Sequence, residues 1–301
     1  MSPLPAVSLA AVPGKRARIL ELAVEIERRG FSGIHCPSFG DAVGLCLSLA
    51  HVTERVEMGT SIQPIYLRHP VDLAQAGAYI HEVSGGRFRL GIGVSHGPVH
   101  DRLGVETGAP LADVRSYVAA MRDAARQSGP LPPVVLATLR DKMLALSVEI
   151  ADGAVWANAS RSHMAAQLAQ VPEERRAGGF SVGNMIPTVI DEDRDAARAV
   201  HRRTLTGYVT LPNYRNYWKA AGYEAEMTAI EQAIDAGDRE ALPGLMPDAW
   251  LDDCTLSGSA SQVREGVEAW LDAGVTTPIL VMSSTSGGQQ VAFSELFEAF
   301  A

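Results

Sequence analysis

Small polar or flexible residues stand where several short apolar runs of the chain end. They are Ser38, Ser61, Gln63, Gly93, Ser95, His96, Thr138 and Asn158. Hydroxyl, amide and imidazole groups form hydrogen bonds with a large planar ligand, and a glycine lets a ring approach the backbone. These residue types therefore favour binding of a cofactor over hydrolysis. For Gly93 the alternative is a packing role in a crowded strand.

Residues 138–140 combine a hydroxyl with a guanidinium between an apolar run and an amphipathic stretch. The backbone N–H groups at the start of a helix attract anions, and arginine binds phosphate through paired hydrogen bonds. Thr138 and Arg140 therefore suggest a phosphate site. The alternative is an ordinary helix start with an arginine on the surface.

Three other chemistries lack the residues that they need. None of the lysines, at positions 15, 142 and 219, stands at a strand end, where a Schiff-base lysine is needed. His96 and His100 have a metal-site spacing, with Asp101 next, but Pro98 between them disfavours one helical face, and we expect no metal. A glycosidase needs two carboxylates at strand ends, and these segments hold none.

The hydrophobic pattern predicts the elements that position these residues. Short apolar runs alternate with stretches in which apolar residues recur at helical spacing. Eight runs are predicted to be strands, at residues 7–10, 33–36, 56–62, 88–92, 134–137, 154–157, 180–190 and 277–282. Eight strand-then-helix units predict an α/β fold, a (β/α)8 barrel with its chemistry at the carboxyl ends of the strands. The alternative is an open, doubly wound sheet.

Residues 205–247 break this rhythm after the seventh predicted strand. The stretch has helical patterns and contains an aromatic cluster of Tyr208, Tyr214, Tyr217, Trp218 and Tyr223. We interpret it as a helical insertion that packs on the barrel, within one domain spanning residues 1–301. The functional alternative is a lid over the site or a dimer contact. Residues 93–110 are predicted to be a loop.

Composition and charge disfavour several classes of protein. The chain has 301 residues, 47% of them hydrophobic, and a formal net charge of -9, which argues against a nucleic-acid partner. No apolar run reaches the ~18 residues of a membrane span, and residues 1–9 do not look like a signal peptide. Cys36, Cys46 and Cys254 form no CxxC pair or disulfide framework. We therefore expect a cytoplasmic protein that acts on a small molecule.

Three groups of motifs carry a family resemblance. The first is Gly-Thr-Ser-Ile-Gln-Pro-Ile-Tyr-Leu-Arg-His-Pro at 59–70, Leu-Ala-Gln at 73–75 and Ser-Gly-Gly-Arg-Phe-Arg-Leu-Gly-Ile-Gly-Val-Ser-His at 84–96. The second is Val-Val-Leu-Ala-Thr-Leu-Arg-Asp-Lys-Met-Leu at 134–144 with Ala-Asp-Gly at 151–153. The third is Ser-Gly-Ser-Ala-Ser-Gln-Val-Arg at 257–264 with Ala-Gly-Val at 273–275. In this order the chain resembles the bacterial luciferase-like family, and most of all its branch that uses the deazaflavin coenzyme F-420.

The resemblance implies the (β/α)8 fold, an insertion after strand seven, a homodimer and a set of cofactor-binding positions. The family often has a non-proline cis peptide at the end of strand three, and Ser61 and Ile62 stand at the matching position. The other matching positions are Ser95 and His96 after strand four, Thr138, Leu139 and Arg140 in the phosphate-binding loop, and Ala157 and Asn158 after strand six.

The chain departs from the family pattern in two places. Many members carry an acidic residue and a histidine just after strand two, near the hydride-transfer centre, where this chain has Ser38 and then phenylalanine, with His35 slightly earlier. Several members have paired glycines at positions 139–140. His96, which titrates near neutral pH, is our main candidate for a proton donor or acceptor, with His35 and Ser38 as further catalytic candidates. The alternative for His96 is a hydrogen-bonding role that only holds the cofactor.

The resulting hypothesis is an oxidoreductase that transfers a hydride between F-420 and a small organic substrate. The cofactor would supply the chemistry, and the protein would supply position and electrostatics. One alternative is an FMN-dependent monooxygenase, as in the luciferase branch proper. Another is a catalytically silent barrel that binds the cofactor, which the missing strand-two histidine keeps open.

Overall fold

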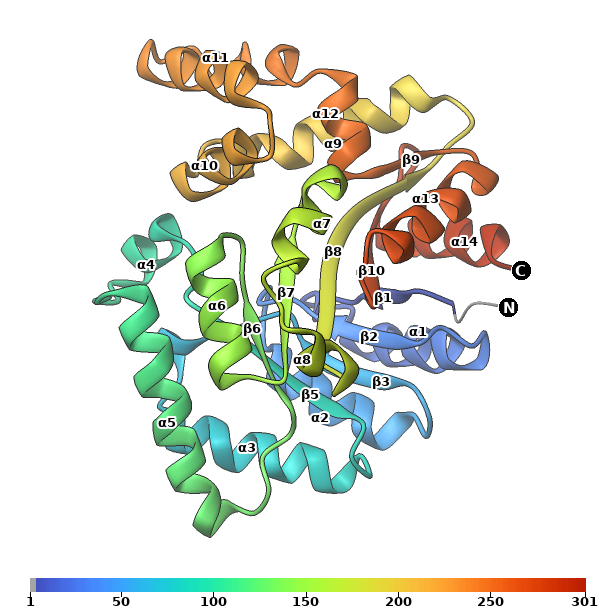
Figure 1. Cartoon of the computed structure of the whole chain (residues 1–301). Helices are drawn as coiled ribbons and strands as arrows, with labels where there is room; N and C mark the ends of the chain where they lie inside the picture. Colours follow the sequence, from blue (N-terminus) through green and yellow to red (C-terminus); the bar gives the residue numbers. More distant parts are fainter. Residues whose placement is uncertain (1–3) are drawn as a thin grey trace. The chain divides into compact units, whose positions relative to one another are not determined.

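A computed structural model describes residues 4–301 of the chain (Figure 1). Residues 1–3, part of the stretch in which no signal peptide is expected, lie outside the described residues. The chain divides into two compact units, and each is described by itself below. Unit 1 comprises Met1–Trp156 and Gln170–Gly183, and unit 2 comprises Ala157–Ala169 and Asn184–Ala301.

The described residues contain short strands that form one sheet. The strands are β1 Ala6–Ser8, β2 Gly33–Cys36, β3 Glu57–Thr60, β4 Gln63–Pro64, β5 Phe88–Gly93, β6 Val134–Ala137, β7 Gly153–Ala157, β8 Ser181–Ile190, β9 Leu256–Gly258 and β10 Thr277–Ser283. Their hydrogen-bonded order is β10-β1-β2-β3-β5-β6-β7-β8-β9, with β4 beside β5 and a further pairing of β10 with β8. This parallel order is that of a (β/α)8 barrel, so the predicted fold class is confirmed.

All eight predicted strands are present, with ends shifted by a few residues. The third predicted strand, 56–62, is divided into β3 and β4 by the Ser61–Ile62 peptide, which is cis. The cis peptide implied by the family resemblance is therefore confirmed. β9, a strand of three residues that pairs with β8, was not predicted from the sequence.

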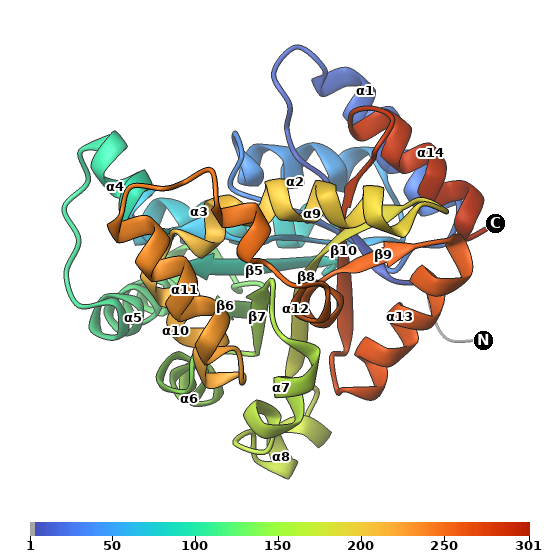
Figure 2. The same cartoon turned by 90° about the horizontal axis from the view of Figure 1, so that it is seen from above.

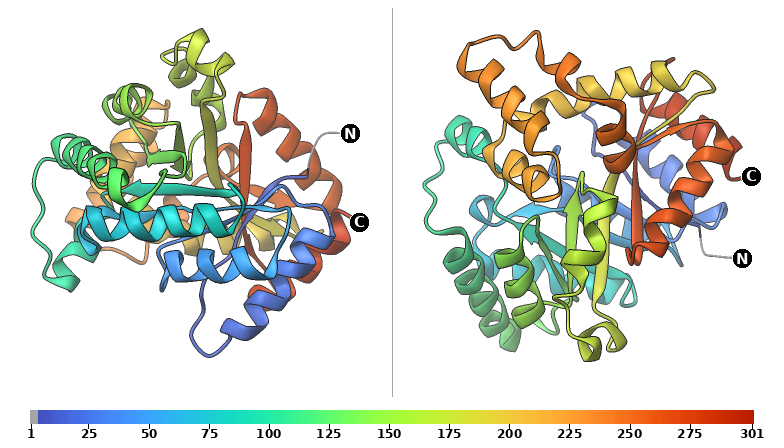
Figure 3. Two further views of the ribbon diagram at one scale, coloured as in Figure 1. Left: turned by 90° about the horizontal axis from the view of Figure 1, so that it is seen from below. Right: turned by 45° about the horizontal axis from the view of Figure 1, so that its top comes forward.

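The helices alternate with the strands as predicted. They are α1 Arg16–Arg28, α2 Ala42–Val52, α3 Pro70–Val83, α4 Gly97–Leu103, α5 Pro110–Ser128, α6 Asp141–Ile150, α7 Arg161–Leu168, α8 Glu173–Ala177, α9 Arg194–Val209, α10 Pro212–Ala220, α11 Glu224–Asp235, α12 Asp248–Cys254, α13 Ala260–Asp272 and α14 Gln289–Ala299, with 3-10 helices η1 Ile65–Leu67 and η2 Leu242–Leu245. In unit 1, α3 and α5 lie side by side (Figure 3). None of the helices within residues 4–301 is both long enough and apolar enough for a membrane crossing.

Residues 93–110 are predicted to be a loop, and residues 205–247 a helical insertion. The prediction of a loop over 93–110 is wrong in part, because α4 forms within this stretch. Pro98 lies in the first turn of this helix, where its missing N–H is not needed. Residues 205–247 run from the end of α9 through α10, α11 and η2, and Figure 2 shows α10 beside α11. That this stretch is an insertion within a single domain stays a prediction.

Arg87, from the motif at 84–96, fixes the end of α2 in unit 1. Its guanidinium donates to the carbonyl oxygens of Ala50 at 3.3 Å, Thr53 at 2.9 Å and Val56 at 2.9 Å. These carbonyls include groups at the end of a helix that lack partners within it. This residue of the family motif therefore stabilises the fold between α2 and β3.

Glycine at 91 lets the backbones of β3 and β5 meet. A Cβ atom at Gly91 would lie 2.0 Å from the carbonyl oxygen of Thr60, and the Thr60 hydroxyl donates to the Gly91 carbonyl at 2.6 Å. A Cβ at Gly93 would lie 2.6 Å from the Cβ of Ala137 and 3.2 Å from Cδ1 of Ile62. Both glycines therefore have a packing role, because no side chain fits at either position.

Gly91→Ala tests this backbone contact. We expect a loss of about 3 kcal/mol or more in unfolding free energy, or no soluble protein, since the carbonyl of Thr60 cannot move out of the sheet. Gly207→Ala is the control, because that helical glycine has no atom within 4 Å of its Cβ position and alanine there should stabilise by about 0.5–1 kcal/mol. Thermal melts measure both. A wild-type midpoint for Gly91→Ala would contradict the packing role.

The carboxylate of Glu27 on α1 is a second test of the fold. It accepts hydrogen bonds from the backbone N–H groups of Glu54 at 3.0 Å, Arg55 at 2.6 Å and Val56 at 2.8 Å. Burial opposes ionisation, but these donors outweigh it, so the pKa of Glu27 is lowered. A lowered folded-state pKa stabilises the fold above the unfolded value of ~4.3, and this stabilisation is lost as the pH falls through the folded-state value.

We therefore expect Glu27→Gln to reduce the unfolding free energy by about 1 kcal/mol at neutral pH. The difference from wild type should shrink as the pH falls below ~4. Urea unfolding at several pH values measures it, with Glu21→Gln on the exposed side of α1 as the matched control. A deficit that persists unchanged at low pH would rule out the charged hydrogen bonds as its cause.

Candidate functional site

The Ser61–Ile62 peptide lies at the carboxyl end of β3 in unit 1. The N–H of Ser61 donates to the carbonyl of Cys36 at 2.8 Å, which ties this segment to the end of β2. The side chain of Ile62 lies against the backbone of Gly91 and Gly93. The Ser61 hydroxyl is buried and has no hydrogen-bond partner within residues 4–301. A buried hydroxyl without a partner costs about 1–3 kcal/mol, so a ligand that bonds to it would recover this cost.

The next predicted residues continue from the same strand ends. Gln63 is buried, its amide donates to the carbonyl of Pro64 at 3.2 Å, and β4 pairs Pro64 with Gly93. Ser61, Ile62, Gln63 and Gly93 are therefore brought together in unit 1. Thr138 follows Ala137, whose Cβ contacts the backbone of Gly93, so the end of β6 joins the same group.

Ser95 and His96 follow β5. Ser95 has a φ angle of 63°, in the left-handed region that non-glycine residues seldom adopt, and this strain often marks a functional segment. His96 is the N-cap of α4 and is half-buried. Burial lowers the pKa of His96, and the neighbouring His100 lowers it further, so the imidazole is mainly neutral at neutral pH.

The metal interpretation of this loop finds no support. The ring nitrogen Nε2 of His100 is hydrogen-bonded to the carbonyl of Val94, and its ring packs edge-on against Tyr66 with centroids 5.2 Å apart. In the part of the chain that the structure describes, no three histidine, cysteine or acidic side chains are placed to hold a metal ion.

The segment 138–140 leads into α6. The N–H of Thr138 donates to the carbonyl of Val155 at 2.9 Å, while its buried hydroxyl has no partner among residues 4–301. Leu139 is half-buried. Arg140 is the exposed N-cap of α6, its side chain gives no cap bond, and the Asp141 carboxylate next to it accepts from Gln170 at 3.0 Å. An unpartnered hydroxyl and a solvent-facing guanidinium thus flank a helix start, although Asp141 adds a negative charge there.

The two strand-two candidates, His35 and Ser38, lie on either side of Cys36, whose carbonyl accepts from Ser61. His35 pairs with Gly59 of β3, two residues before Ser61, and its ring nitrogens lie 3.4 Å from the Cβ positions of Gly33 and Gly59. Burial lowers the pKa of His35 to about 4, with the ion pair of Glu57 and Arg89 contributing smaller opposite effects. His35 is therefore neutral and lies deeper along the strands.

Ser38 is exposed and lies in the loop between β2 and α2. His35 thus lies in β2 beside β3, whereas Ser38 lies in a loop. His35 and Cys36 face opposite sides of β2, since His35 lies against Gly33 and Gly59 whereas Cys36 contacts Cys46 of α2.

In unit 2 the residues after β7 adopt an unusual backbone. Asn158 has a φ angle of 57°, and it and Ser95 are the only non-glycine residues with positive φ within residues 4–301. Its N–H donates to the carbonyl of Met185 at 3.0 Å, and its buried amide nitrogen Nδ2 has no hydrogen-bond partner among the described residues. Ala157 before it is half-buried. The two left-handed residues are thus both among the predicted cofactor-binding positions.

Sequence reasoning missed Asn184 of β8. Its side chain is fully buried, Oδ1 accepts from the N–H of Ala159 at 3.4 Å, and Nδ2 has no partner in the described part of the chain. A polar side chain inside an apolar strand was the available signal, because an asparagine needs a specific reason to be buried there.

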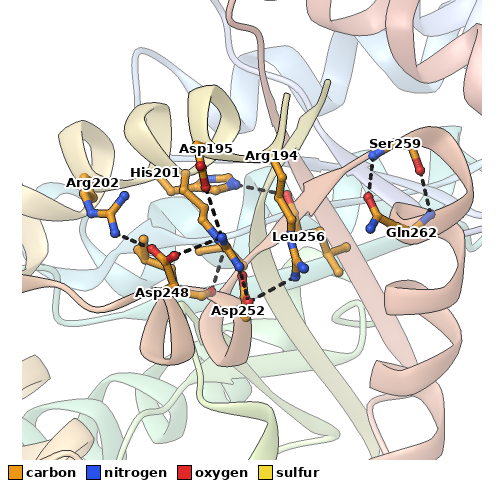
Figure 4. Close-up of polar contacts among 12 residues, drawn as sticks. Arg194, Asp195, His201, Arg202, Asp248, Asp252, Leu256, Ser259 and Gln262 are labelled. Atoms are coloured by element: carbon orange, nitrogen blue, oxygen red, sulfur yellow. Dashed lines mark hydrogen bonds and ion pairs between the residues drawn. The ribbon is translucent and has the colours of Figure 1, made fainter. Parts of the chain in front are cut away.

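An ion-pair network in unit 2 joins α9 to α12 (Figure 4). Arg198 donates to both oxygens of Asp252, at 3.1 and 2.7 Å, and to Asp248 at 2.9 Å. Arg202 also pairs with Asp248, and Arg194 with Asp252 at 3.0 Å. These bidentate contacts have a structural role, since all the acids involved are neutralised by arginine.

The comparisons with known proteins agree with this geometry. Residues 5–277 match the family model described as luciferase-like monooxygenase. The chain is 27% identical over 259 residues to the 5,10-methylenetetrahydromethanopterin reductase of Archaeoglobus fulgidus, covering 76% of this chain and 77% of that one.

Two solved structures share the fold. One is the coenzyme F-420 dependent tetrahydromethanopterin reductase from Methanopyrus kandleri, with a TM-score of 0.74 and 18% identity, covering 100% of this chain and 96% of that one. The other is the oxygenating constituent of 3,6-diketocamphane monooxygenase from Pseudomonas putida in complex with FMN, with a TM-score of 0.67 and 16% identity, covering 99% and 96%. From the match over residues 5–277, the chain belongs to the luciferase-like monooxygenase family, as its motifs predicted.

Proposed function

We propose that the chain is an oxidoreductase that binds coenzyme F-420 and transfers a hydride between it and a small organic molecule. The observation that carries this proposal is the buried, unpartnered hydroxyl of Ser61 beside Ile62, at a strand end where no side chain fits on Gly93. The name of the Archaeoglobus relative, a reductase, and that of the F-420 dependent structure support it.

The residues of unit 1 fit a planar ring. Ile62 offers an apolar surface, and the hydroxyl of Ser61 can bond to a polar edge of the ring. Gln63 and Ser95 would add further polar contacts, and Gly93 keeps that strand end free of a side chain. In unit 2, we propose Ala157 and Asn158 as cofactor-binding residues. When bound, a deazaflavin supplies a carbon centre that gives or takes a hydride.

The phosphate-bearing tail would be held at the start of α6. The Thr138 hydroxyl would donate to the phosphate, and Arg140 would supply a positive charge. Leu139 would pack against the part of the tail that joins the phosphate to the ring. Because Asp141 is already bonded to Gln170, its charge is partly offset by that amide.

His96 is the proposed acid–base residue. Since its lowered pKa keeps the ring mainly neutral, it is better suited to accept a proton from the substrate than to donate one. Ser38, exposed in the loop after β2, would contact the substrate. His35, deeper and neutral, would act as a hydrogen-bonding group beneath the ligand.

An FMN-dependent monooxygenase is the second candidate. The fold likeness to an FMN complex and the absence of paired glycines at 139–140 favour it. A silent cofactor-binding barrel is the third, since no histidine follows Ser38. We further propose that the protein is a cytoplasmic homodimer, without nucleic-acid or membrane partners.

Titration of the protein with F-420 and FMN, followed by fluorescence, tests the function directly. We expect micromolar or tighter binding of F-420 and at least ~10-fold weaker binding of FMN, a gap of about 1.4 kcal/mol. The reverse order would move the protein to the monooxygenase candidate. Binding of neither would contradict the proposal.

Ser61→Ala refines the same titration. The hydroxyl has no partner in the described residues, so the melting midpoint should not fall, while Kd for the cofactor should rise about 5-fold, as expected for one lost neutral hydrogen bond. Ser147→Ala, which removes a buried hydroxyl that donates to the carbonyl of Met143, is the matched control. It should lower the melting midpoint and leave Kd for the cofactor unchanged. An unchanged Kd for Ser61→Ala would remove this residue from the site.

The pH dependence of turnover tests His96. A neutral imidazole that accepts a proton should give a rate that falls at acid pH, with an apparent pKa below 6.5. His96→Gln should lower kcat by about 10²-fold and abolish this acid limb. Unchanged turnover in the variant would limit His96 to holding the cofactor.

A further inference from the structure

The loop that follows β7 is fixed by hydrogen bonds from distant parts of unit 2. The indole N–H of Trp218 on α10 donates to the carbonyl of Asn158 at 3.2 Å. The N–H of Ser160 donates to the hydroxyl of Tyr217 at 3.0 Å, and the N–H of Ala159 donates to Asn184 at 3.4 Å. Three consecutive residues are thus bonded to side chains that lie 25 or more positions away in the sequence.

The first turn of α7, which follows the loop, is held by a buried carboxylate. Asp253 on α12 accepts from the N–H and the hydroxyl of Ser162, at 2.9 and 2.8 Å, and from the hydroxyl of Tyr223 at 3.1 Å. The Ser160 hydroxyl lies 3.4 Å from the Cys254 thiol. Asp253 is only 8% exposed, so its charge depends on these donors.

The aromatic residues that hold the loop are themselves immobilised. Trp218 and Trp250 are fully buried and pack edge to face with centroids 4.8 Å apart, and Tyr214 packs on Trp218 at 5.3 Å. Burial raises the pKa of Tyr217, which keeps its hydroxyl neutral. These side chains are core, and a mobile lid would not bury them. The packing interpretation of the aromatic cluster therefore fits the structure.

We propose that Trp218 is a positioning residue for ligand binding, because its N–H holds Asn158 in the left-handed conformation that presents the loop after β7 to the cofactor. The proposal rests on the proposed function, in which Ala157 and Asn158 contact the cofactor. The helices after β8 then act as a rigid support for the loop after β7. The ligand class is a flavin or deazaflavin ring, whose carbonyl edge suits backbone and amide donors.

The chain offers a matched pair of variants. Trp218→Phe and Trp250→Phe each shrink a fully buried indole by the same volume, in the same cluster. The Trp250 indole N–H, however, has no hydrogen-bond partner within residues 4–301. The difference between the two variants therefore isolates the bond from Trp218 to Asn158.

The experiment measures Kd for F-420 and for FMN by fluorescence, the melting midpoint, and hydrogen exchange of the peptide covering residues 157–162 in the protein without cofactor. We expect similar midpoints, faster exchange in W218F than in W250F, and a Kd raised about 5- to 10-fold in W218F but less than about 2-fold in W250F. Tyr217→Phe, which removes only the hydroxyl at Ser160, should act like W218F and serves if that variant does not fold.

Equal Kd values and equal exchange in the two tryptophan variants would overturn the positioning role. Faster exchange in W218F with an unchanged Kd would overturn it too, since the loop would then not contact the cofactor. If the wild-type protein binds neither F-420 nor FMN, the proposed function fails, and equal exchange would separately show that Trp218 does not hold the loop.

Discussion

The contact between the Thr60 carbonyl and the backbone of Gly91 is the constraint on which unit 1 depends. Its 2.0 Å distance to a hypothetical Cβ leaves room for hydrogen only. Because β3 and β5 meet this closely, Ile62 can lie across Gly91 and Gly93, and Ser61 is buried where its hydroxyl has no partner among residues 4–301. The lack of a side chain at Gly91 thus sets the geometry of the proposed ring-binding surface.

The chemistry proposed for the site follows from neutrality more than from charge. Burial keeps His35 and His96 mainly uncharged, and Ser61 and Thr138 offer hydrogen bonds without charge. Such a surface suits a large conjugated ring and a hydride, because hydride transfer needs position and exclusion of water more than it needs a strong acid. Arg87 and the Arg198 network are charged groups that serve the fold instead.

Each unit contains one non-glycine residue in the left-handed region among the described residues, and the two are held differently. Its strained residue, Asn158, is held by side chains from helices that follow β8, whereas Ser95 in unit 1 lies in a short loop before α4. Strained backbone persists only where surrounding structure determines it. Trp218 bonds to the carbonyl of Asn158 itself, and Asp253 holds Ser162 at the start of α7.

The sequence by itself indicated the (β/α)8 order, the eight strands, the family and the position of the cis peptide, because periodic apolar runs and local motifs depend on neighbours in the chain. It did not determine that Gly91 and Gly93 are packing glycines, that His35 lies against Gly33 and Gly59, or that Nδ2 of the buried Asn184 has no partner among the described residues. It also showed the aromatic cluster but not its partner, Asn158. Those facts depend on residues brought together from 25 to 60 positions apart, and only the tertiary structure decides which donors and acceptors meet.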